Sequence, residues 1–236
     1  MTLVLVAHGT RDPAGVALAR RLAATMGARL AFVDVLGPAL REVLAEVAGP
    51  VTVVPAFLAA GYHVHVDVPR EVAASGRDDV TVTEALGPHS AVVSAVTTRL
   101  GEAGWRRGDA VVLAAAGSSD SRAVADVHAA AQRLSMSTGR RVRVGYLATG
   151  TPRLRELVGE LRATGRRRVA VGCWLLAPGR FHRAATDCGA DVVAEPLGTH
   201  PAVLGRLSEL AGSHGRHLVA AHSCGAASGD SIMRYC

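Results

Sequence analysis

Four blocks of this sequence occur twice in the same order, and this duplication constrains the fold more than any other feature. The matching blocks are 2–12 with 110–120, 40–43 with 154–157, 51–61 with 169–179, and 84–92 with 195–203. An internal repeat of this length predicts two homologous halves, each large enough to be a domain. We expect these halves at residues 1–104 and 105–212, followed by a tail at 213–236.

Within each half, short apolar runs alternate with segments that have helical spacing. In the first half we expect strands at 4–7, 30–35, 51–58 and 80–83, and helices at 14–26, 40–47, 68–75 and 91–100. The opening run from Leu3 to Ala7 is apolar throughout, which is typical of a strand buried on both faces. Strands and helices in alternation predict α/β halves with mainly parallel sheets and right-handed crossovers.

The composition excludes several function classes. The net charge is +6, and every basic residue is arginine because the chain contains no lysine. Lysine Schiff-base chemistry and a Gly-Lys-Ser/Thr phosphate loop are therefore excluded. Guanidinium groups suit carboxylate ligands, whereas nucleic acid is disfavoured because only 3% of residues are aromatic stacking platforms. No apolar run is as long as a membrane span and no signal peptide is evident, so we expect a soluble cytoplasmic protein.

None of the four cysteines forms a Cys-x-x-Cys pair, so neither a zinc ribbon nor a redox motif is indicated. We interpret Cys173 and Cys188 as reduced structural thiols. Cys224 and Cys236 lie in the tail, where they could bind a metal or form a disulfide.

Histidines follow two predicted strands of the first half. His8 comes directly after the first strand, and His63 follows the third, with His65 two residues later. The carboxyl ends of neighbouring parallel strands lie at one edge of a sheet, where such sheets bind ligands. Neutral imidazoles bind iron, cobalt, nickel and zinc. The pair His8 and His63 therefore predicts a divalent metal site. His65 would share a face with His63 on an extended segment, or it could equally be a solvated side chain.

The second copy lacks these imidazoles. Ala116 stands in place of His8, and a gapless match puts Phe181 in place of His63, with His182 one residue later. A histidine needed only for the fold would be expected in both copies. We therefore expect one working site, in the N-terminal half, facing a partner half that shapes the cleft.

Other polar residues have two interpretations each. Asp67 could orient an imidazole or cap the helix that opens at Pro69, and we favour the cap. His89 and His200 occur in both copies before a helix, which favours a structural role at the helix start. Arginines in the same loops as the histidines are either ordinary exposed side chains or ligands of substrate carboxylates. These arginines are Arg11, Arg180 and Arg183.

Three segments together resemble the class II chelatases, the sirohydrochlorin ferrochelatases and cobaltochelatases of the CbiX and SirB type. Residues 7–13 resemble the His-Gly-Ser/Thr-Arg strand end of that family. Residues 55–69 are similar to its Phe-Leu-x-x-Gly-x-His-x-x-x-Asp-Ile/Val-Pro segment, and 85–89 add a third match. The resemblance spans about residues 1–210 and includes the two-half layout of actinobacterial members. It implies two chelatase-like, three-layer α/β/α halves.

The resemblance also implies an activity and a site. The expected reaction is ATP-independent insertion of Fe²⁺ into sirohydrochlorin to give siroheme, by a lyase without a prosthetic group. His8 and His63 would bind the metal and help to remove the pyrrole protons. The residues implied in substrate binding are Gly9, Thr10, Arg11, Gly61, Tyr62, His65 and Arg180. The partners would be the tetrapyrrole and the metal, with no nucleic acid and no membrane, and the protein a monomer or a dimer.

Two alternatives stay open at this point. The first alternative is a cobalt or nickel chelatase, because imidazole ligands discriminate little between iron, cobalt and nickel. The second alternative is a tetrapyrrole- or metal-binding protein without turnover. A hydrolase built on His8 is weaker, because no Gly-x-Ser-x-Gly nucleophile motif accompanies the histidine.

Overall fold

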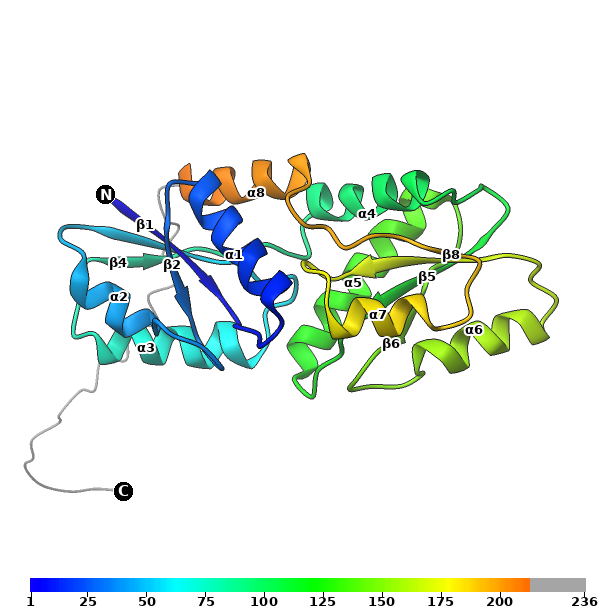
Figure 1. The fold of residues 1–236 in the computed structure, drawn as a ribbon, viewed down its shortest axis with the longest axis horizontal. Helices are drawn as coiled ribbons and strands as arrows, with labels where there is room; N and C mark the ends of the chain where they lie inside the picture. Colours follow the sequence, from blue (N-terminus) through cyan, green and yellow to red (C-terminus); the bar gives the residue numbers. More distant parts are fainter. Residues whose placement is uncertain (213–236) are drawn as a thin grey trace, which may run out of the picture.

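The computed structural model describes residues 1–212, which form two parallel four-stranded sheets lying end to end (Figure 1). The first sheet has the order β2-β1-β3-β4 and the second has the order β6-β5-β7-β8. Their strands are β1 (Thr2–Ala7), β2 (Arg29–Phe32), β3 (Val51–Pro55), β4 (Val80–Val82), β5 (Ala110–Ala115), β6 (Arg143–Tyr146), β7 (Val169–Trp174) and β8 (Val192–Val193). The shared order and direction confirm the predicted α/β duplication.

The helices fall between the strands as the repeat predicts. They are α1 (Pro13–Thr25), α2 (Leu40–Glu46), α3 (Val68–Ala74), α4 (Ser90–Glu102), α5 (Ser121–Thr138), α6 (Leu154–Ala163), α7 (Arg180–Thr186) and α8 (Pro201–Gly212). A π-helical turn, η1 (His63–Asp67), runs directly into α3. The segment of His63 and His65 is therefore helical, and the extended geometry that we expected to give them a common face is wrong.

Two predicted strands are shorter in the structure. β2 ends at Phe32 and β3 ends at Pro55, although the apolar residues continue beyond both. Beyond these ends Val35 is 47% exposed, whereas Phe57 and Leu58 are half-buried by packing and not by sheet pairing. Phe57 packs against the core under α2, and Leu58 packs against the core on the other face of the sheet.

Each sheet has an outer core of its own. Val4 and Val6 point to the face covered by α2 and α3, where they pack with Leu40 and Val68. Val112 and Ala114 make the equivalent core beneath α6 and α7 in the second half. Because side chains alternate along a strand, Leu5 and Leu113 point to the opposite faces of these sheets.

Those opposite faces share one core, and the two halves exchange helices within it. α4 comes from the first repeat but packs on β7 and α5 of the second, whereas α8 comes from the second repeat and packs on β3. Figure 1 shows α8 beside the first sheet and α4 beside the second. At one contact, a Cβ on Gly172 of β7 would lie 2.7 Å from Val96 of α4. Arg206 of α8 also pairs with Glu84 at 3.0 Å.

The carboxyl ends of the two sheets face each other at the centre of the molecule. Asp12, which follows β1, lies 3.4 Å from Arg183 of α7. In the mirrored contact, Gly61 follows β3 and lies against Ala123 of α5. The strand ends of both halves are thereby brought to a common junction. Within residues 1–212 no helix combines the length and apolarity needed to cross a membrane.

Candidate metal centre

Three donor side chains converge at the carboxyl edge of the first sheet. His8 follows β1, Asp34 follows β2, and His63 opens η1 after β3. One ligand atom from each lies within 4.8 Å of the others, and the two imidazole centroids are 4.3 Å apart. The sheet order β2-β1-β3 makes these strand ends neighbours, which confirms that the topology brings His8 and His63 together.

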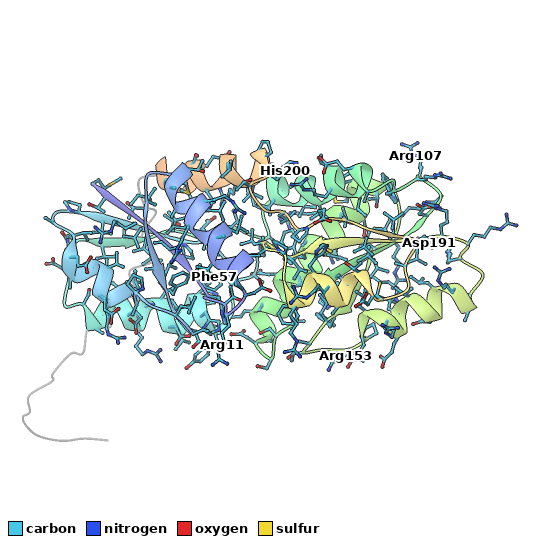
Figure 2. All side chains as sticks on the ribbon, viewed as in Figure 1. Arg11, Phe57, Arg107, Arg153, Asp191 and His200 are labelled. Atoms are coloured by element: carbon cyan, nitrogen blue, oxygen red, sulfur yellow. The ribbon has the colours of Figure 1, made fainter. Side chains whose placement is uncertain are left out.

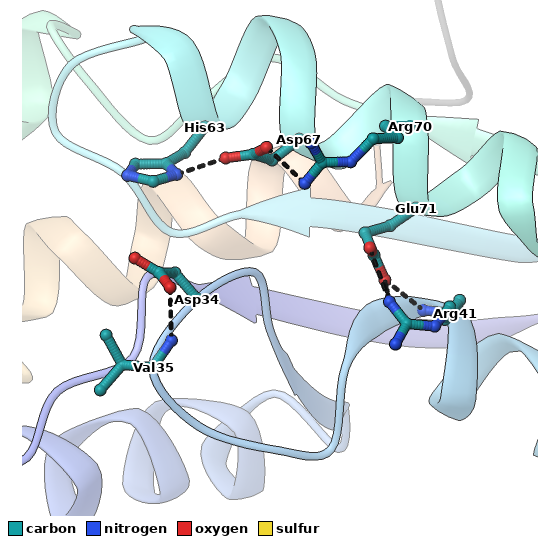
Figure 3. A network of polar contacts seen from close by, with 7 residues as sticks. All are labelled: Asp34, Val35, Arg41, His63, Asp67, Arg70 and Glu71. Atoms are coloured by element: carbon teal, nitrogen blue, oxygen red, sulfur yellow. Dashed lines mark hydrogen bonds and ion pairs between the residues drawn. The ribbon is translucent and has the colours of Figure 1, made fainter.

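A glycine lets the loops of His8 and Asp34 approach closely. Gly9 has φ +86°, and a Cβ at this position would lie 2.1 Å from the Asp34 carbonyl oxygen. The Asp34 carboxylate accepts a 2.7 Å hydrogen bond from the Val35 amide, and Figure 3 shows this carboxylate turned toward the His63 ring. His8 Nδ1 lies 3.0 Å from the Gly9 carbonyl. Since a carbonyl can only accept, Nδ1 donates and Nε2 keeps its lone pair for a metal.

The other imidazole is oriented by a buried carboxylate (Figure 3). His63 Nδ1 is 2.6 Å from Asp67 Oδ2, and Arg70 holds the second oxygen of Asp67 at 2.7 Å. Asp67 is 5% exposed. A hydrogen bond from Nδ1 to a carboxylate fixes the tautomer of a metal-binding histidine and leaves Nε2 as the donor to the metal.

This arrangement corrects our preferred interpretation of Asp67. The Asp67 side chain makes no capping hydrogen bond at the start of α3. Its two oxygens contact His63 and Arg70 instead. The alternative that we ranked second, orientation of an imidazole, is the one observed.

Thr10 and Arg11, which we predicted to bind substrate, follow His8 and Gly9 after β1 and differ in how freely their side chains can reach a ligand. The Thr10 hydroxyl accepts a 3.1 Å hydrogen bond from the Asp12 amide, and its methyl group lies against Gly15. Arg11 is exposed and pairs with no acidic side chain among residues 1–212; Figure 2 shows it on the lower side of the first half. Of these, Arg11 has the side chain that is free to meet a ligand.

The predicted residues around His63 divide between the metal centre and the junction. Tyr62 is 53% exposed, and its ring centroid lies 6.2 Å from that of His63. Gly61 is buried against α5 of the second half. His65 is exposed. Hydrogen bonds from Arg122 lower the pKa of Asp120, at the start of α5, to about 2, and His65 makes the smallest contribution to that shift.

Arg180, the last predicted contact, lies elsewhere. It is the first residue of α7 and lines a cavity formed by residues of the second half. The structure therefore brings His8 and His63 together, with Tyr62 beside them, and puts Arg180 at the equivalent edge of the other sheet.

Sequence reasoning missed Asp34, the third donor. The register pairs Phe32 with Ala7 and Tyr146 with Ala115, so Asp34 corresponds to Ala148 two residues further on. The second copy thus replaces all three donors by apolar residues, Ala116, Ala148 and Phe181. A comparison of position 34 with position 148 would have shown that Asp34, like His8 and His63, is absent from the second copy.

The donor set fits a divalent transition metal. Two imidazole nitrogens and one carboxylate oxygen, with open positions, form the arrangement typical of Fe²⁺ in non-haem enzymes. His8 and Asp34 are exposed, which leaves those positions accessible to a second ligand.

Histidines at two helix starts have the structural role that we expected. The His89 side chain accepts a hydrogen bond from the Ala91 amide at 3.3 Å, and His200 accepts one from Ala202 at 3.1 Å. Cys173 and Cys188 are buried free thiols, also as expected. Cys224 and Cys236 lie outside the described residues.

Comparisons with known proteins identify the family of this chain and proteins that share its fold. The family model described as CbiX matches residues 2–103 and again 110–212. SirB from Bacillus subtilis with Fe³⁺ has a TM-score of 0.74 at 22% identity, covering 89% of this chain and 94% of that one. SirB from subspecies spizizenii in complex with cobalt has 0.71 at 21% identity, with coverage of 89% and 94%.

A third solved structure is CbiX, the terminal enzyme for biosynthesis of siroheme in denitrifying bacteria. Its TM-score is 0.65 at 20% identity, covering 89% of this chain and 98% of that one. At these identities the structures show a shared fold over nearly the whole of each protein. No match to this chain was found among curated protein sequences.

Proposed function

This chain belongs to the CbiX family, and from that premise we propose that it is a sirohydrochlorin ferrochelatase, a lyase that inserts Fe²⁺ without ATP. The observation that carries the proposal is the triad of His8, Asp34 and His63 at an accessible strand edge. Each imidazole has its Nδ1 occupied by an acceptor, so both Nε2 atoms are available to a metal.

The triad can hold an incoming metal and then release it. Three protein donors leave coordination positions open, and the nitrogens of the macrocycle enter at those positions. As the four macrocycle nitrogens take over, His8, Asp34 and His63 lose the metal. Exchangeable ligands of this kind suit a metal that is substrate and not a resident cofactor.

The same histidines can accept the protons that the macrocycle loses when the metal enters. Entry of one divalent metal releases two N–H protons from the macrocycle. The imidazoles that the metal leaves become bases, and an imidazole accepts a proton near neutral pH. At His63, the Asp67 carboxylate lies 2.6 Å from Nδ1, and its other oxygen is held by Arg70. Each histidine thus acts first as a metal ligand and then as a proton acceptor.

Iron is the metal that we propose, because the two-histidine, one-carboxylate set is typical of Fe²⁺ sites. SirB, which shares this fold, has been solved with Fe³⁺ and with cobalt, and cobalt is therefore the second metal to test. For the macrocycle, we propose contacts from Arg11 and Tyr62, the exposed side chains beside the triad. We further propose backbone or side-chain contacts from the other predicted residues, Gly9, Thr10, Gly61 and His65.

We also propose that the protein works in the reducing cytoplasm. Cys173 and Cys188 are both free thiols inside the second half, which agrees with a compartment where disulfides are rare. Fe²⁺ is likewise maintained in a reducing environment.

An absorbance assay tests the proposed activity. Sirohydrochlorin is mixed anaerobically with Fe²⁺, Co²⁺ or Ni²⁺, with and without the protein, and the spectral change of metallation is followed. We expect the protein to accelerate metallation, and Fe²⁺ to give the highest kcat/KM. Metallation at the protein-free rate with every metal would refute the chelatase proposal, whereas faster turnover with cobalt would refute only the choice of iron.

A further inference from the structure

Two adjoining cavities open at the carboxyl edge of the second sheet, where the second copy has lost the metal donors. Their volumes are about 420 and 380 Å³, and they share Leu147, Arg153 and Ala184. The first cavity is lined by Leu147, Ala148, Arg153, Arg180, Phe181 and Ala184. Cavities of this size accommodate small organic ligands.

The cavity occupies the position of the metal centre in the other copy. Ala148 corresponds to Asp34 through the sheet register, and Phe181 corresponds to His63 by the same count from β7. Where the first copy provides a carboxylate and an imidazole, the second provides a methyl group and a phenyl ring. Phe181 is 38% exposed, so part of its ring is open to a flat apolar ligand.

The electrostatics of this position are also reversed. Arg180 stands where the first copy has Tyr62, and Arg153 stands where it has Ala39. The Asp34 carboxylate has been lost and the guanidinium groups of Arg153 and Arg180 have been gained, whereas Arg11 is replaced by Ser119. The position has therefore changed from one that suits a cation to one that suits an anion.

Both guanidinium groups are available to a ligand. Within the described part of the chain, neither Arg153 nor Arg180 forms an ion pair, and both side chains are exposed. The neighbouring arginines are engaged, since Arg183 pairs with Asp12 and Arg155 donates to the Asp187 carbonyl at 2.5 Å. Figure 2 shows Arg153 on the side of the second half where Arg11 lies on the first.

We propose that this cavity is a second binding site, which holds a tetrapyrrole polycarboxylate without inserting a metal. The apolar floor suits the macrocycle, and the two arginines suit its carboxylates, which guanidinium groups bind in a bidentate manner. The identity of the ligand rests on the proposed function, because the duplicated fold presents the same edge to the same molecule. Without metal donors the site binds the metal-free and the metallated macrocycle alike. It therefore serves to hold substrate or product next to the metal centre.

Binding stoichiometry tests this proposal. Metal-free sirohydrochlorin is titrated into the full chain in the absence of metal, and its absorbance or fluorescence is followed to saturation. We expect wild type to bind two equivalents. Arg153→Glu with Arg180→Glu is expected to bind one, and Arg153→Glu alone is expected to raise the Kd of the second equivalent about tenfold or more.

Matched variants isolate the effect of charge at the cavity. Arg141→Glu with Arg166→Glu makes the same charge change on exposed arginines at the opposite ends of β6 and β7, and it should keep two equivalents. His8→Ala with His63→Ala should keep the equivalent held in the cavity, because the second site does not use those donors. Thermal unfolding of each variant checks that the fold is retained.

Three results would overturn the second site. They are one equivalent in wild type, two equivalents in the cavity double variant, and loss of all binding in that variant. The last result would mean that one macrocycle spans both halves. Metallation by the same wild-type preparation separates the two proposals, since turnover with a single equivalent removes the second site and leaves the chelatase intact.

Discussion

At the scale of single residues, the carboxylate of Asp67 determines which nitrogen of His63 is left free for the proposed metal. It lies outside the triad, yet it binds His63 Nδ1 at 2.6 Å and is itself held by Arg70. Removing a carboxylate that hydrogen-bonds a metal-binding histidine typically weakens metal affinity by about 10- to 100-fold. This corresponds to about 1.4 to 2.7 kcal/mol of binding free energy.

Asp67→Ala should therefore weaken metal binding while leaving the three donors in place. We expect the Kd for Co²⁺, measured by absorbance titration, to rise roughly 10- to 100-fold. Glu71→Ala is the matched control, because Glu71 is a neighbouring buried carboxylate that pairs with Arg41 and does not touch the triad. It should lower the unfolding temperature without changing the Kd. Equal Kd values for the two variants would show that Asp67 does not position His63.

Sequence reasoning found two of the three donors, and the reason for the omission is physical. His8 and His63 stand out because imidazoles are rare at the ends of apolar runs, and because the second copy lacks them. Asp34 was hidden inside a predicted strand, since Val33 and Val35 continue the apolar pattern past the point where pairing stops. Asp67 looked like a helix cap because a π-helical turn cannot be read from apolar spacing.

At the scale of elements, the junction between β1 and α1 depends on a glycine that both copies keep. Gly9 has φ +86° and its counterpart Gly117 has φ +94°. At each position a Cβ would collide with a backbone carbonyl, of Asp34 and of Thr149 respectively. The glycine is therefore required by the packing of two loops, and it persists in the second copy although the metal donors do not.

Gly9→Ala should damage both stability and the metal centre. A non-glycine residue at positive φ costs roughly 1–2 kcal/mol, and here the clash with Asp34 adds to that strain. Gly27→Ala is the control, because Gly27 has φ +61° with no atom within 4 Å of a Cβ. Urea unfolding should show a larger loss for Gly9→Ala, and only this variant should lose Co²⁺ affinity. Equal losses of stability with unchanged affinity would disprove the close-approach argument.

At the scale of the whole molecule, the exchange of α4 and α8 makes the halves interdependent. Apolar spacing predicted α4, and the repeat predicted both the helix after His200 and the two sheets. Nothing in that pattern said which sheet each helix covers, because the apolar face of an amphipathic helix does not encode its partner. Leu100 and Leu207 are fully buried only because each packs within the core shared by both halves.

A chain limited to residues 1–108 should therefore not be a stable monomer. Its sheet would lack α8, and its own α4 would lack β7. We expect two copies to exchange α4, since α4 of one copy can cover the sheet of the other as α8 does in the intact chain. Light scattering after gel filtration should report a dimer. A monomer with cooperative thermal unfolding would contradict the proposed interdependence.

Alkaline pH should destabilise the fold through a buried thiol. Burial raises the pKa of Cys173 to about 12 from the ordinary thiol value of 9.0, with a smaller contribution from Cys188. The folded state therefore keeps its proton while the unfolded state loses it. The stabilisation is complete below pH 9 and declines as pH rises toward about 12. Cys173→Ala should show a shallower decline in unfolding temperature over this range, and an unchanged slope would refute the assignment.

The central claim is that His8, Asp34 and His63 bind the metal that the protein inserts. The most direct measurement is the initial rate of Fe²⁺ insertion into sirohydrochlorin by wild type, His8→Ala and Asp34→Ala. His128→Ala is the control, because it removes an exposed imidazole of α5 that is not one of the three donors. We predict that His8→Ala and Asp34→Ala fall to, or near, the protein-free rate while the control keeps the wild-type rate. Full activity in His8→Ala would contradict the account.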